Sequence, residues 1–397
     1  METNTAVMVR IGELWLKSEQ VKKQFMASLM RNIRAALDAE NIEYKTEEYR
    51  GRILIYGDAE RIAFVVSRVF GIVDVSICTT CGNSPAEIAA AAVSVADGKL
   101  HPGMRFAARA RRQHVGGFTS QELARIVADA VWEKVPDFVV DLENPEYEIF
   151  VEAREYGGIV YDSRIPGQGG LPLGTAGKAM ILLSAGIDSP VAAWQMMRRV
   201  FVVSDVIMDG GRWAGKATQN HALDNARILS TWSPGRNFAV WVVDMEPFFS
   251  AMTESCDRHY TCIFCKRFMM RVADALASRG KFDALVSGEN LGQVASQTIQ
   301  NMRVITASVE TPILRPILTY DKEETVVISR KIGTFHENPG DTGCLAVPKK
   351  PATRSSVELI EREEEKIDLT GLIENACSSA ELWIARDGEI SRKPIET

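Results

Sequence analysis

Residues 179–199 read AMILLSAGIDSPVAAWQMMRR, and this stretch decides the fold of the C-terminal half. The apolar run at 180–183 predicts a buried strand, 184–189 a tight polar turn, and the residues from Pro190 onward a helix. Proline suits the first turn of a helix, where its missing N–H has no intrahelical partner. Unpaired N–H groups and the positive end of the helix dipole then face the turn. The stretch therefore predicts a site for an anion such as phosphate.

Composition sets the broad class of the protein. A chain of 397 residues predicts two or three domains. No apolar run approaches the roughly 20 residues that span a bilayer, and the N-terminus METNTAVMVR lacks the pattern of a secretory signal. Seven cysteines, an odd number, argue against a disulfide framework. We expect a cytoplasmic protein without a membrane partner. The net charge of -6 indicates no DNA binding, so RNA contact would need a local basic cluster.

The first eighty residues alternate strand and helix patterns in the order βαββαβ. Strands are expected at 7–11, 42–47, 52–56 and 71–77, with one helix after Ser18 and a second that Asp58 caps. The apolar face of the first helix consists of Val21, Phe25, Leu29, Ile33 and Leu37. The order predicts a ferredoxin-like unit, a fold that serves many functions.

The most basic stretch is HPGMRFAARARRQH, residues 101–114. On a strand, Arg105, Arg109 and Arg111 project to one side. With Arg112 and His114, five basic residues fall within ten positions. A solvated strand face is the simplest interpretation, but this density favours contact with phosphates.

Beyond the basic stretch the sequence pattern changes twice. A helix capped by Ser120 or Thr119 and an alternating strand within 141–155 are followed by a Gly- and Pro-rich stretch at 157–177, which predicts a linker. Strands and helices then alternate over 179–287. This order predicts a doubly wound parallel sheet, with its ligand at the carboxyl ends of the strands.

A second polar group of residues lies in this half. Cys262 and Cys265 form a CxxC pair at the start of a helix, which suits a redox pair, half of a metal site or two buried thiols. Lys266 and Arg267 follow directly and favour a functional role, since cations lower thiol pKa values and bind phosphate. Downstream, the segment SGENLGQVASQT (287–298) ends a strand in a polar turn.

The remaining cysteines give weaker signals. Cys78 and Cys81 form another CxxC pair, for which zinc binding and surface thiols both remain open. Cys256 suits a core or surface thiol.

The string SAGIDSPV resembles the pyrophosphate-binding loop of the ATP pyrophosphatase (PP-loop) superfamily, Ser-Gly-Gly-x-Asp-Ser, with Ala185 at the first glycine. Those enzymes cleave ATP between its α and β phosphates and transfer AMP to a substrate. Residues 62–161, above all the basic strand and residues 118–122, resemble the THUMP domain. That resemblance implies contact with the acceptor end of tRNA, through backbone and shape.

The segments GENLGQVASQT, CKRFMMR and ILRPILTYDKEE resemble the tRNA 4-thiouridine synthetase (ThiI) family, and the resemblance covers about residues 8–354. The family adenylates O4 of uridine 8 in tRNA and replaces the adenylate with sulfur. The resemblance implies an α/β protein with a ferredoxin-like domain at 1–65, a THUMP domain at 66–165, a linker at 166–178 and a PP-loop domain at 179–397. It also implies ATP, Mg²⁺ and a homodimer.

The resemblance also assigns residues. ATP is expected at Leu182, Leu183, Ser184, Gly186, Ser189, Met208, Lys266, Arg267, Gly288 and Gln297. Asp188 is expected to act in catalysis by binding the metal or orienting a donor, and capping the helix is its structural alternative. For tRNA, the expected residues are Arg105, Arg109, Arg111 and Arg112.

Sulfur delivery divides the family. The residues after Arg354 are too few for the rhodanese domain of many relatives. Cys262, Cys265 and Cys344 resemble the three-cysteine set of archaeal-type relatives, which implies a [4Fe-4S] cluster with one open iron to hold sulfide. In the competing mechanism, Cys344 carries a persulfide and Cys265 or Cys262 resolves it. The expected donor is free sulfide or a cysteine desulfurase.

Two features keep other functions open. Ala185 and the segment DGGRWAGK (209–216), which replaces the family's apolar, proline-containing sequence, would suit an RNA-binding protein with a decayed ATP site. An adenylating thiolase for another base or for a sulfur-carrier protein is the nearer alternative.

Overall fold

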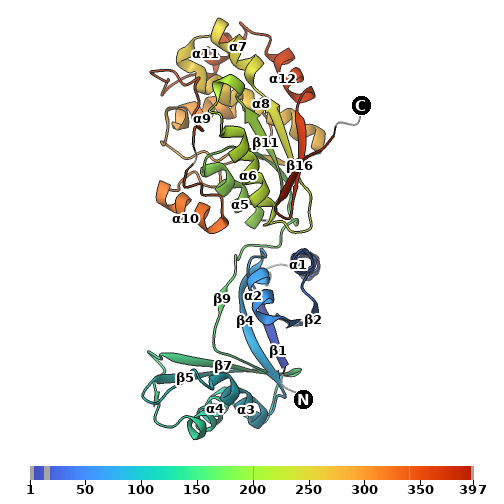
Figure 1. The fold of residues 1–397 in the computed structure, drawn as a ribbon, viewed down its shortest axis with the longest axis vertical. Helices are drawn as coiled ribbons and strands as arrows, with labels where there is room; N and C mark the ends of the chain where they lie inside the picture. Colours follow the sequence, from blue (N-terminus) through green and yellow to red (C-terminus); the bar gives the residue numbers. More distant parts are fainter. Residues whose placement is uncertain (1–3, 13–17, 200, 339, 395–397) are drawn as a thin grey trace. The chain divides into compact units, whose positions relative to one another are not determined.

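The computed structural model describes residues 4–12, 18–199, 201–338 and 340–394. Contacts divide the chain into two compact units (Figure 1). Unit 1 comprises Met1–Lys23 and Ile33–Leu171, and unit 2 comprises Gln24–Asn32 and Pro172–Thr397. Among the described residues, no helix has both the length and the apolar character needed to cross a membrane.

Unit 1 is built on one mixed sheet with the strand order β2-β3-β1-β4-β8-β7-β5-β6, in which β9 also pairs with β4. Its elements are β1 (Asn4–Ile11), α1 (Glu19–Ala39), β2 (Tyr44–Tyr49), β3 (Arg52–Gly57), α2 (Ala59–Ser67), β4 (Ile72–Cys81), α3 (Pro85–Ala96), β5 (Arg105–Gln113), α4 (Ser120–Lys134), β6 (Val139–Val140), β7 (Tyr147–Arg154), β8 (Gly157–Tyr161) and β9 (Ile165–Pro166). The first six follow the predicted βαββαβ order. Asp58 caps α2 as expected, by accepting the Arg61 N–H.

The second half of unit 1 packs α3 and α4 against β5, β7 and β8. Thr119, rather than Ser120, caps α4 and forms a capping box with Glu122. The expected linker at 157–177 is wrong at its start, because Gly157–Tyr161 is the fully buried strand β8. A methyl group at Gly158 would lie 2.6 Å from the Gly82 carbonyl oxygen. Glycine here serves close packing of backbones and not a flexible connection.

Unit 2 has the strand order β14-β13-β10-β11-β12-β15-β16. Its elements are β10 (Gly177–Leu183), α5 (Asp188–Arg198), β11 (Phe201–Asp209), η2 (Gly211–Trp213), α6 (Thr218–Ser230), β12 (Phe238–Asp244), α7 (Glu246–Ser255), η3 (Arg258–Tyr260), α8 (Thr261–Gly280), β13 (Ala284–Val286), η4 (Ala295–Gln297), α9 (Ile299–Thr306), β14 (Ile313–Leu314), α10 (Lys322–Ile332), α11 (Val357–Glu364), α12 (Leu369–Ser378), β15 (Glu381–Arg386) and β16 (Glu389–Arg392). Strands β10 to β14 are parallel, as predicted. The antiparallel β15–β16 hairpin at the edge was not predicted.

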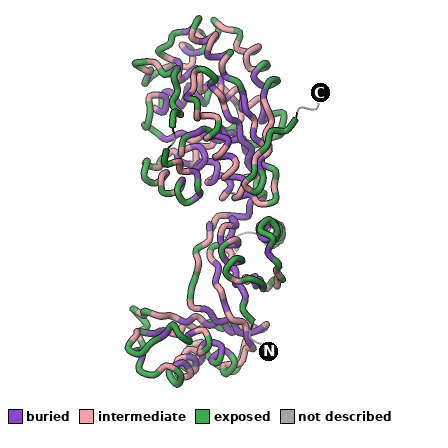
Figure 2. Tube along the Cα trace, viewed as in Figure 1, coloured by how far each residue is buried: buried purple, intermediate pink, exposed green. Residues whose placement is uncertain are grey.

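The sheet of unit 2 is covered on both faces, and its central strands are buried (Figure 2). Met180, Leu182 and Val206 point into a core formed with α7, α8 and α12. Helices α5 and α6 pack against β10 and β11 and against each other. Alternate residues of each strand face opposite sides of the sheet, and helices cover both sides. The carboxyl ends of the strands therefore stay free to bind a ligand.

Candidate functional site

The parallel sheet changes direction between β10 and β13. From β10 the chain moves outward through β11 and β12, and then returns to place β13 and β14 on the other side. In such a sheet, ligands bind outside the carboxyl ends of the two strands at this switch point. The loop at 184–189 follows β10 and the segment from Ser287 follows β13, so the fold brings the two predicted polar turns together.

Gly288 shows how closely these turns approach. A methyl group at Gly288 would lie 2.6 Å from the Ser189 backbone nitrogen and 2.7 Å from its Cα. Such a contact is shorter than any side chain tolerates, so residue 288 must be glycine for the turns to meet in this way.

The loop after β10 is closed by its own serines. The Ser184 N–H donates to Ser189 Oγ at 2.8 Å, and the two hydroxyls are 2.8 Å apart. Ile187, at the N-cap of α5, has no side chain that caps the helix, so the first N–H groups of α5 are open to a ligand. Ala185 has no positive φ, which removes the conformational objection to alanine there.

Asp188 is the first residue of α5, and the alternative that it caps the helix is wrong. Its carboxylate lies 3.2 and 3.3 Å from the Nζ of Lys322, the first residue of α10. Lys322 was not singled out from the sequence. It lies in the TYDKEE segment beside Asp321, and a lysine in the first turn of a helix gives no signal of its own.

Lys266 belongs to a buried ion network beneath the second turn. Its Nζ lies 2.8 Å from Glu289, which also accepts from Arg315 at 2.7 Å and from Ser287 Oγ at 3.1 Å. Burial raises the pKa of Glu289, but the two cations outweigh it and hold the pKa below its usual value. The network ties α8 to both strands β13 and β14, and Lys266 stays partly exposed.

Arg267 requires a correction. Its side chain is 0 % exposed, and its donors bind Glu364 at 2.8 and 3.0 Å and the Val304 carbonyl at 2.6 Å. A guanidinium with no exposed surface cannot contact a phosphate. Arg267 therefore fastens α8 to α9 and α11, and its expected role in ATP binding is wrong.

The other predicted nucleotide residues lie at strand ends and in the second turn. Leu182 and Leu183 end β10 and are buried, while Met208 lies one residue before the end of β11 and is half-buried. Gly186 is exposed in the first loop. Gln297 is buried, and its Oε1 has no hydrogen-bond partner among the described residues. An orphan acceptor at this place suits a polar group of a bound ligand.

An amide also supports the first loop from beneath. Buried Asn225 donates from Nδ2 to the Ser184 carbonyl at 3.0 Å, and its Oδ1 lies 3.0 Å from His336 Nε2. Because Oδ1 is only an acceptor, His336 must carry a proton on Nε2. Neither residue was predicted from the sequence.

The fold brings together the three expected reactive cysteines. Burial raises the pKa of Cys265 to about 12, and the thiols of Cys344 and Cys262 add to that effect. The pKa of Cys262 is also raised, first by burial and then by the Cys344 thiol. Cys262 and Cys265 are half-buried in the first turn of α8, and Cys344 is exposed.

A resident cluster needs more than this proximity. Within the described ranges, no group of three or more Cys, His, Asp or Glu side chains is arranged to hold a metal ion. Cys262, Cys265 and Cys344 thus form no site for a single metal ion, and a [4Fe-4S] cluster on them stays a prediction.

The basic strand of unit 1 is the expected β5, but its charges are unequal. Arg109 Nε lies 2.8 Å from Glu148, and Arg105 lies 3.8 Å from Asp141. Arg111 and Arg112 are exposed, and no carboxylate of the described residues pairs with either. Two of the four expected arginines are thus already partly neutralised by acids of the same unit.

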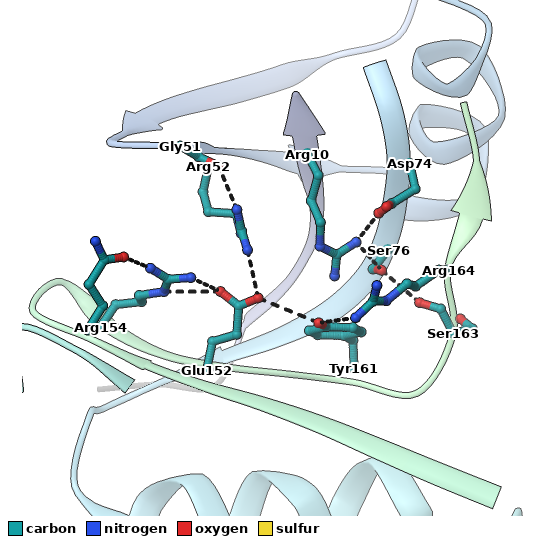
Figure 3. Close-up of polar contacts among 11 residues, drawn as sticks. Arg10, Gly51, Arg52, Asp74, Ser76, Glu152, Arg154, Tyr161, Ser163 and Arg164 are labelled. Carbon is teal, nitrogen blue, oxygen red and sulfur yellow. Dashed lines mark hydrogen bonds and ion pairs between the residues drawn. The ribbon is translucent and has the colours of Figure 1, made fainter. Parts of the chain in front are cut away.

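Beside β5 lies a pocket of 730 Å³, whose lining includes Arg109, Arg111, Arg125 and Arg164. Tyr161 and Arg164 also line this pocket, and Figure 3 shows the Arg164 guanidinium beside Tyr161. Arg164 lies 4.7 Å from the centre of the Phe150 ring, which stacks on Tyr161. The pocket combines cations with aromatic faces, as surfaces that bind single-stranded RNA do.

A buried acid in the lining of this pocket holds the two halves of unit 1 together. Glu152 accepts from Arg52 of β3 at 3.0 Å and from Arg154 at 2.5 and 3.0 Å (Figure 3). Burial raises the pKa of Glu152, and the two arginines more than reverse that effect. Because Glu152 takes up Arg52 and Arg154, these two cations are not free to bind a ligand.

Comparison with known proteins covers both units. A model described as "Thiamine biosynthesis protein (ThiI)" matches residues 174–369, the "ThiI ferredoxin-like domain" residues 6–76 and the "THUMP domain" residues 83–161. A "Probable tRNA sulfurtransferase" of Methanosarcina mazei is 38% identical over 96% of this chain and 95% of its own length. One of Thermoanaerobacter sp. (strain X514) is 36% identical over 93% and 97%.

A crystal structure of a 4-thiouridine synthetase–RNA complex with bound ATP has a TM-score of 0.87 at 28% identity, and covers 96% of this chain and 100% of its own. With this fold and these full-length matches, the chain belongs to the ThiI family of tRNA sulfurtransferases.

Proposed function

We propose that the protein adenylates O4 of uridine 8 in tRNA and replaces the adenylate with sulfur, giving 4-thiouridine. One observation carries the proposal: the loop at 184–189 and Gly288 meet at the switch point of the sheet, within a chain whose relatives are named tRNA sulfurtransferases. The related synthetase with bound ATP supports ATP as the cosubstrate. We keep the predicted division into domains near residues 65, 165 and 178.

The first step forms an adenylate. O4 of uridine attacks the α-phosphorus, the bond to the bridging oxygen breaks, pyrophosphate leaves and the base loses its N3 proton. The open N–H groups of α5 and the hydroxyls of Ser184 and Ser189 bind the phosphates. Asp188 and the serine hydroxyls are oxygen ligands of the kind that Mg²⁺ accepts alongside phosphate, and the ion would neutralise charge on the departing pyrophosphate. Lys322, 3.2 Å from Asp188, adds a cation at the same place.

The second step needs sulfur. A terminal persulfide sulfur on Cys344 attacks C4, and the C4–O4 bond breaks, so that AMP leaves with O4. Cys262 or Cys265 then attacks Cys344 Sγ, which releases 4-thiouridine and leaves a disulfide. A persulfide-forming cysteine desulfurase reloads the carrier after a dithiol has reduced that disulfide. The [4Fe-4S] cluster stays a prediction, which iron and acid-labile sulfide content of anaerobically purified protein would test.

Unit 1 would bind the tRNA. Arg111 and Arg112, with the pocket beside β5, provide cations for the phosphates of the acceptor end. A related synthetase in complex with RNA supports this role. A homodimer, in which one subunit presents tRNA to the other, and a cytoplasmic location belong to the same proposal.

The deciding experiment measures tRNA-dependent pyrophosphate release in wild type and in Asp188→Ala. We expect release from the wild type and at least about 100-fold less from the variant, with tRNA affinity unchanged. Wild type that releases no pyrophosphate would support an RNA-binding protein with a decayed ATP site. Release that depends on a sulfur-carrier protein instead of tRNA would support the other thiolase.

A further inference from the structure

Cys344 lies in a part of the chain without regular structure of its own. The described residues between the end of α10 at Ile332 and the start of α11 at Val357 form no helix or strand. Connections of this length inside a compact domain are usually functional. In the proposed mechanism the Cys344 thiol must reach both the base and a second thiol. This loop must therefore be held in place by another part of the chain.

Residues 213–217 provide that support, and we call them the supporting segment. The Leu345 N–H donates to the Trp213 carbonyl at 2.8 Å and the Gly215 N–H to the Gly343 carbonyl at 2.8 Å, so that Ala214 lies opposite Cys344 in an antiparallel bridge. The Ala217 N–H extends the pairing to the Asp341 carbonyl at 3.0 Å. Three backbone hydrogen bonds thus fix the chain on both sides of the thiol.

Both partners are anchored in the core of unit 2. Trp213 packs against that core, with its ring centre 6.0 Å from that of Phe249. On the facing segment, Ala346 is 0 % exposed and belongs to the same core. The pairing is therefore attached to the core of unit 2 through Trp213 and through Ala346, two residues after Cys344.

Gly215 decides whether the two segments can meet. It is buried, and a methyl group there would lie 2.2 Å from the Asp341 carbonyl oxygen and 2.5 Å from its carbonyl carbon. Its φ is not positive, so alanine would be excluded by this contact and not by backbone conformation. A methyl group at Gly343, on the facing segment, would have no other atom within 4 Å.

We propose that the supporting segment positions Cys344 for sulfur transfer, and that Gly215 is the positioning residue that permits the pairing. This inference rests on the proposed function. It gives a purpose to the segment DGGRWAGK, whose departure from the family pattern suggested a decayed site.

The test compares Gly215→Ala with Gly343→Ala in the full-length protein. We expect Gly215→Ala to lower 4-thiouridine formation at least tenfold while tRNA-dependent pyrophosphate release stays within threefold of wild type. Gly343→Ala should leave both rates within threefold. Equal thiolation by Gly215→Ala and wild type, or an equal loss in Gly343→Ala, would overturn the proposal.

A second readout does not depend on activity. Mild oxidation followed by mass spectrometry gives the yield of disulfide between Cys344 and Cys262 or Cys265. We expect that yield to fall at least fivefold in Gly215→Ala and to stay unchanged in Gly343→Ala; an unchanged yield in both variants would overturn the positioning role. If the wild type releases no pyrophosphate, the proposed function fails, and this yield still decides the inference.

A third variant covers misfolding. If circular dichroism shows that Gly215→Ala does not fold, Leu345→Pro replaces it. Leu345 is exposed, so proline there removes mainly the N–H that donates to Trp213. The same loss of disulfide yield is expected, and wild-type yield would contradict the proposal.

Discussion

The chain carries the same cysteine spacing twice, and the two pairs lie on different kinds of element. Cys78 and Cys81 are on strand β4, where residues three apart face opposite sides, and they lie in two different apolar cores of unit 1. Cys262 and Cys265 are in the first turn of α8, where residues three apart share a face. Spacing therefore acquires chemical meaning only through the element that carries it.

The surroundings of the thiols follow from this difference. Burial raises the pKa of Cys78 to about 12 and that of Cys81 to about 11. The Cys78 thiol also donates to the Ala6 carbonyl at 3.3 Å, so it behaves as a small core residue. Zinc binding and exposed thiols, the two options for this pair, are both wrong for the described structure. Among the described cysteines, only the α8 pair lies near enough to a third thiol, that of Cys344, for it to raise their pKa values.

The largest effect should come from removing both thiols of the α8 pair. Cys262→Ala combined with Cys265→Ala is expected to lower 4-thiouridine formation about 100-fold or more, the scale on which losing a group in the reaction lowers a rate. Cys81→Ala should stay within about threefold, because its thiol only fills a core. Mass spectrometry of digested tRNA measures both. A comparable loss in Cys81→Ala at unchanged melting temperature would break the comparison and place a functional thiol in unit 1.

How much of the fold could be predicted from the sequence also depended on the structural context of each residue. The stretch 179–199 combines an apolar run, small residues and a helical pattern, so local signals sufficed for β10, its loop and α5. The two halves of unit 1 were also predictable, because strand and helix patterns alternate clearly along their sequences. The prediction of a linker was wrong at Gly157–Tyr161 because glycine indicates a loop in most places. Only the packing of Gly158 against Gly82 shows why it lies in a strand.

The residues of the candidate site likewise divide into those that the sequence could predict and those that it could not. Lys266 and Arg267 are neighbours in sequence, but successive helix residues point about 100° apart, so one reaches Glu289 near the site and the other enters the core. Lys322, Asn225 and His336 come from distant elements, and nothing in their own neighbourhoods marks them. The supporting segment is equally hidden, because backbone pairing between distant segments leaves no pattern in side chains.

The next effect in size concerns stability at high pH. The Cys78 thiol has a pKa near 9 when unfolded and about 12 when folded. A raised folded pKa means that its contribution is complete below pH 9 and is lost as the pH rises toward 12, since only the unfolded chain ionises there. We expect this thiol to cost about 2 kcal/mol of unfolding free energy between pH 8 and pH 10.5.

Urea unfolding followed by circular dichroism at both pH values, on wild type and Cys78→Ala, isolates this contribution. The variant should lose less stability than the wild type over the same range, although it starts less stable because a buried group is missing. Equal pH dependence in the two proteins would mean that Cys78 ionises in the folded state, and that its thiol is not a buried core group.

The smallest effect sharpens the division of labour between the units. If unit 1 acts through RNA binding and unit 2 through chemistry, Arg111→Ala should reduce the slope of log affinity against log salt by about 1, with kcat unchanged, because one phosphate contact is lost. Arg105→Ala should change the slope less, since Arg105 already lies near Asp141 and Glu146. Filter binding of tRNA over a salt series measures both. Equal slopes for the two variants would mean that Asp141 and Glu146 release Arg105 to the RNA, whereas a lower kcat in Arg111→Ala would show that unit 1 also contributes to the chemistry.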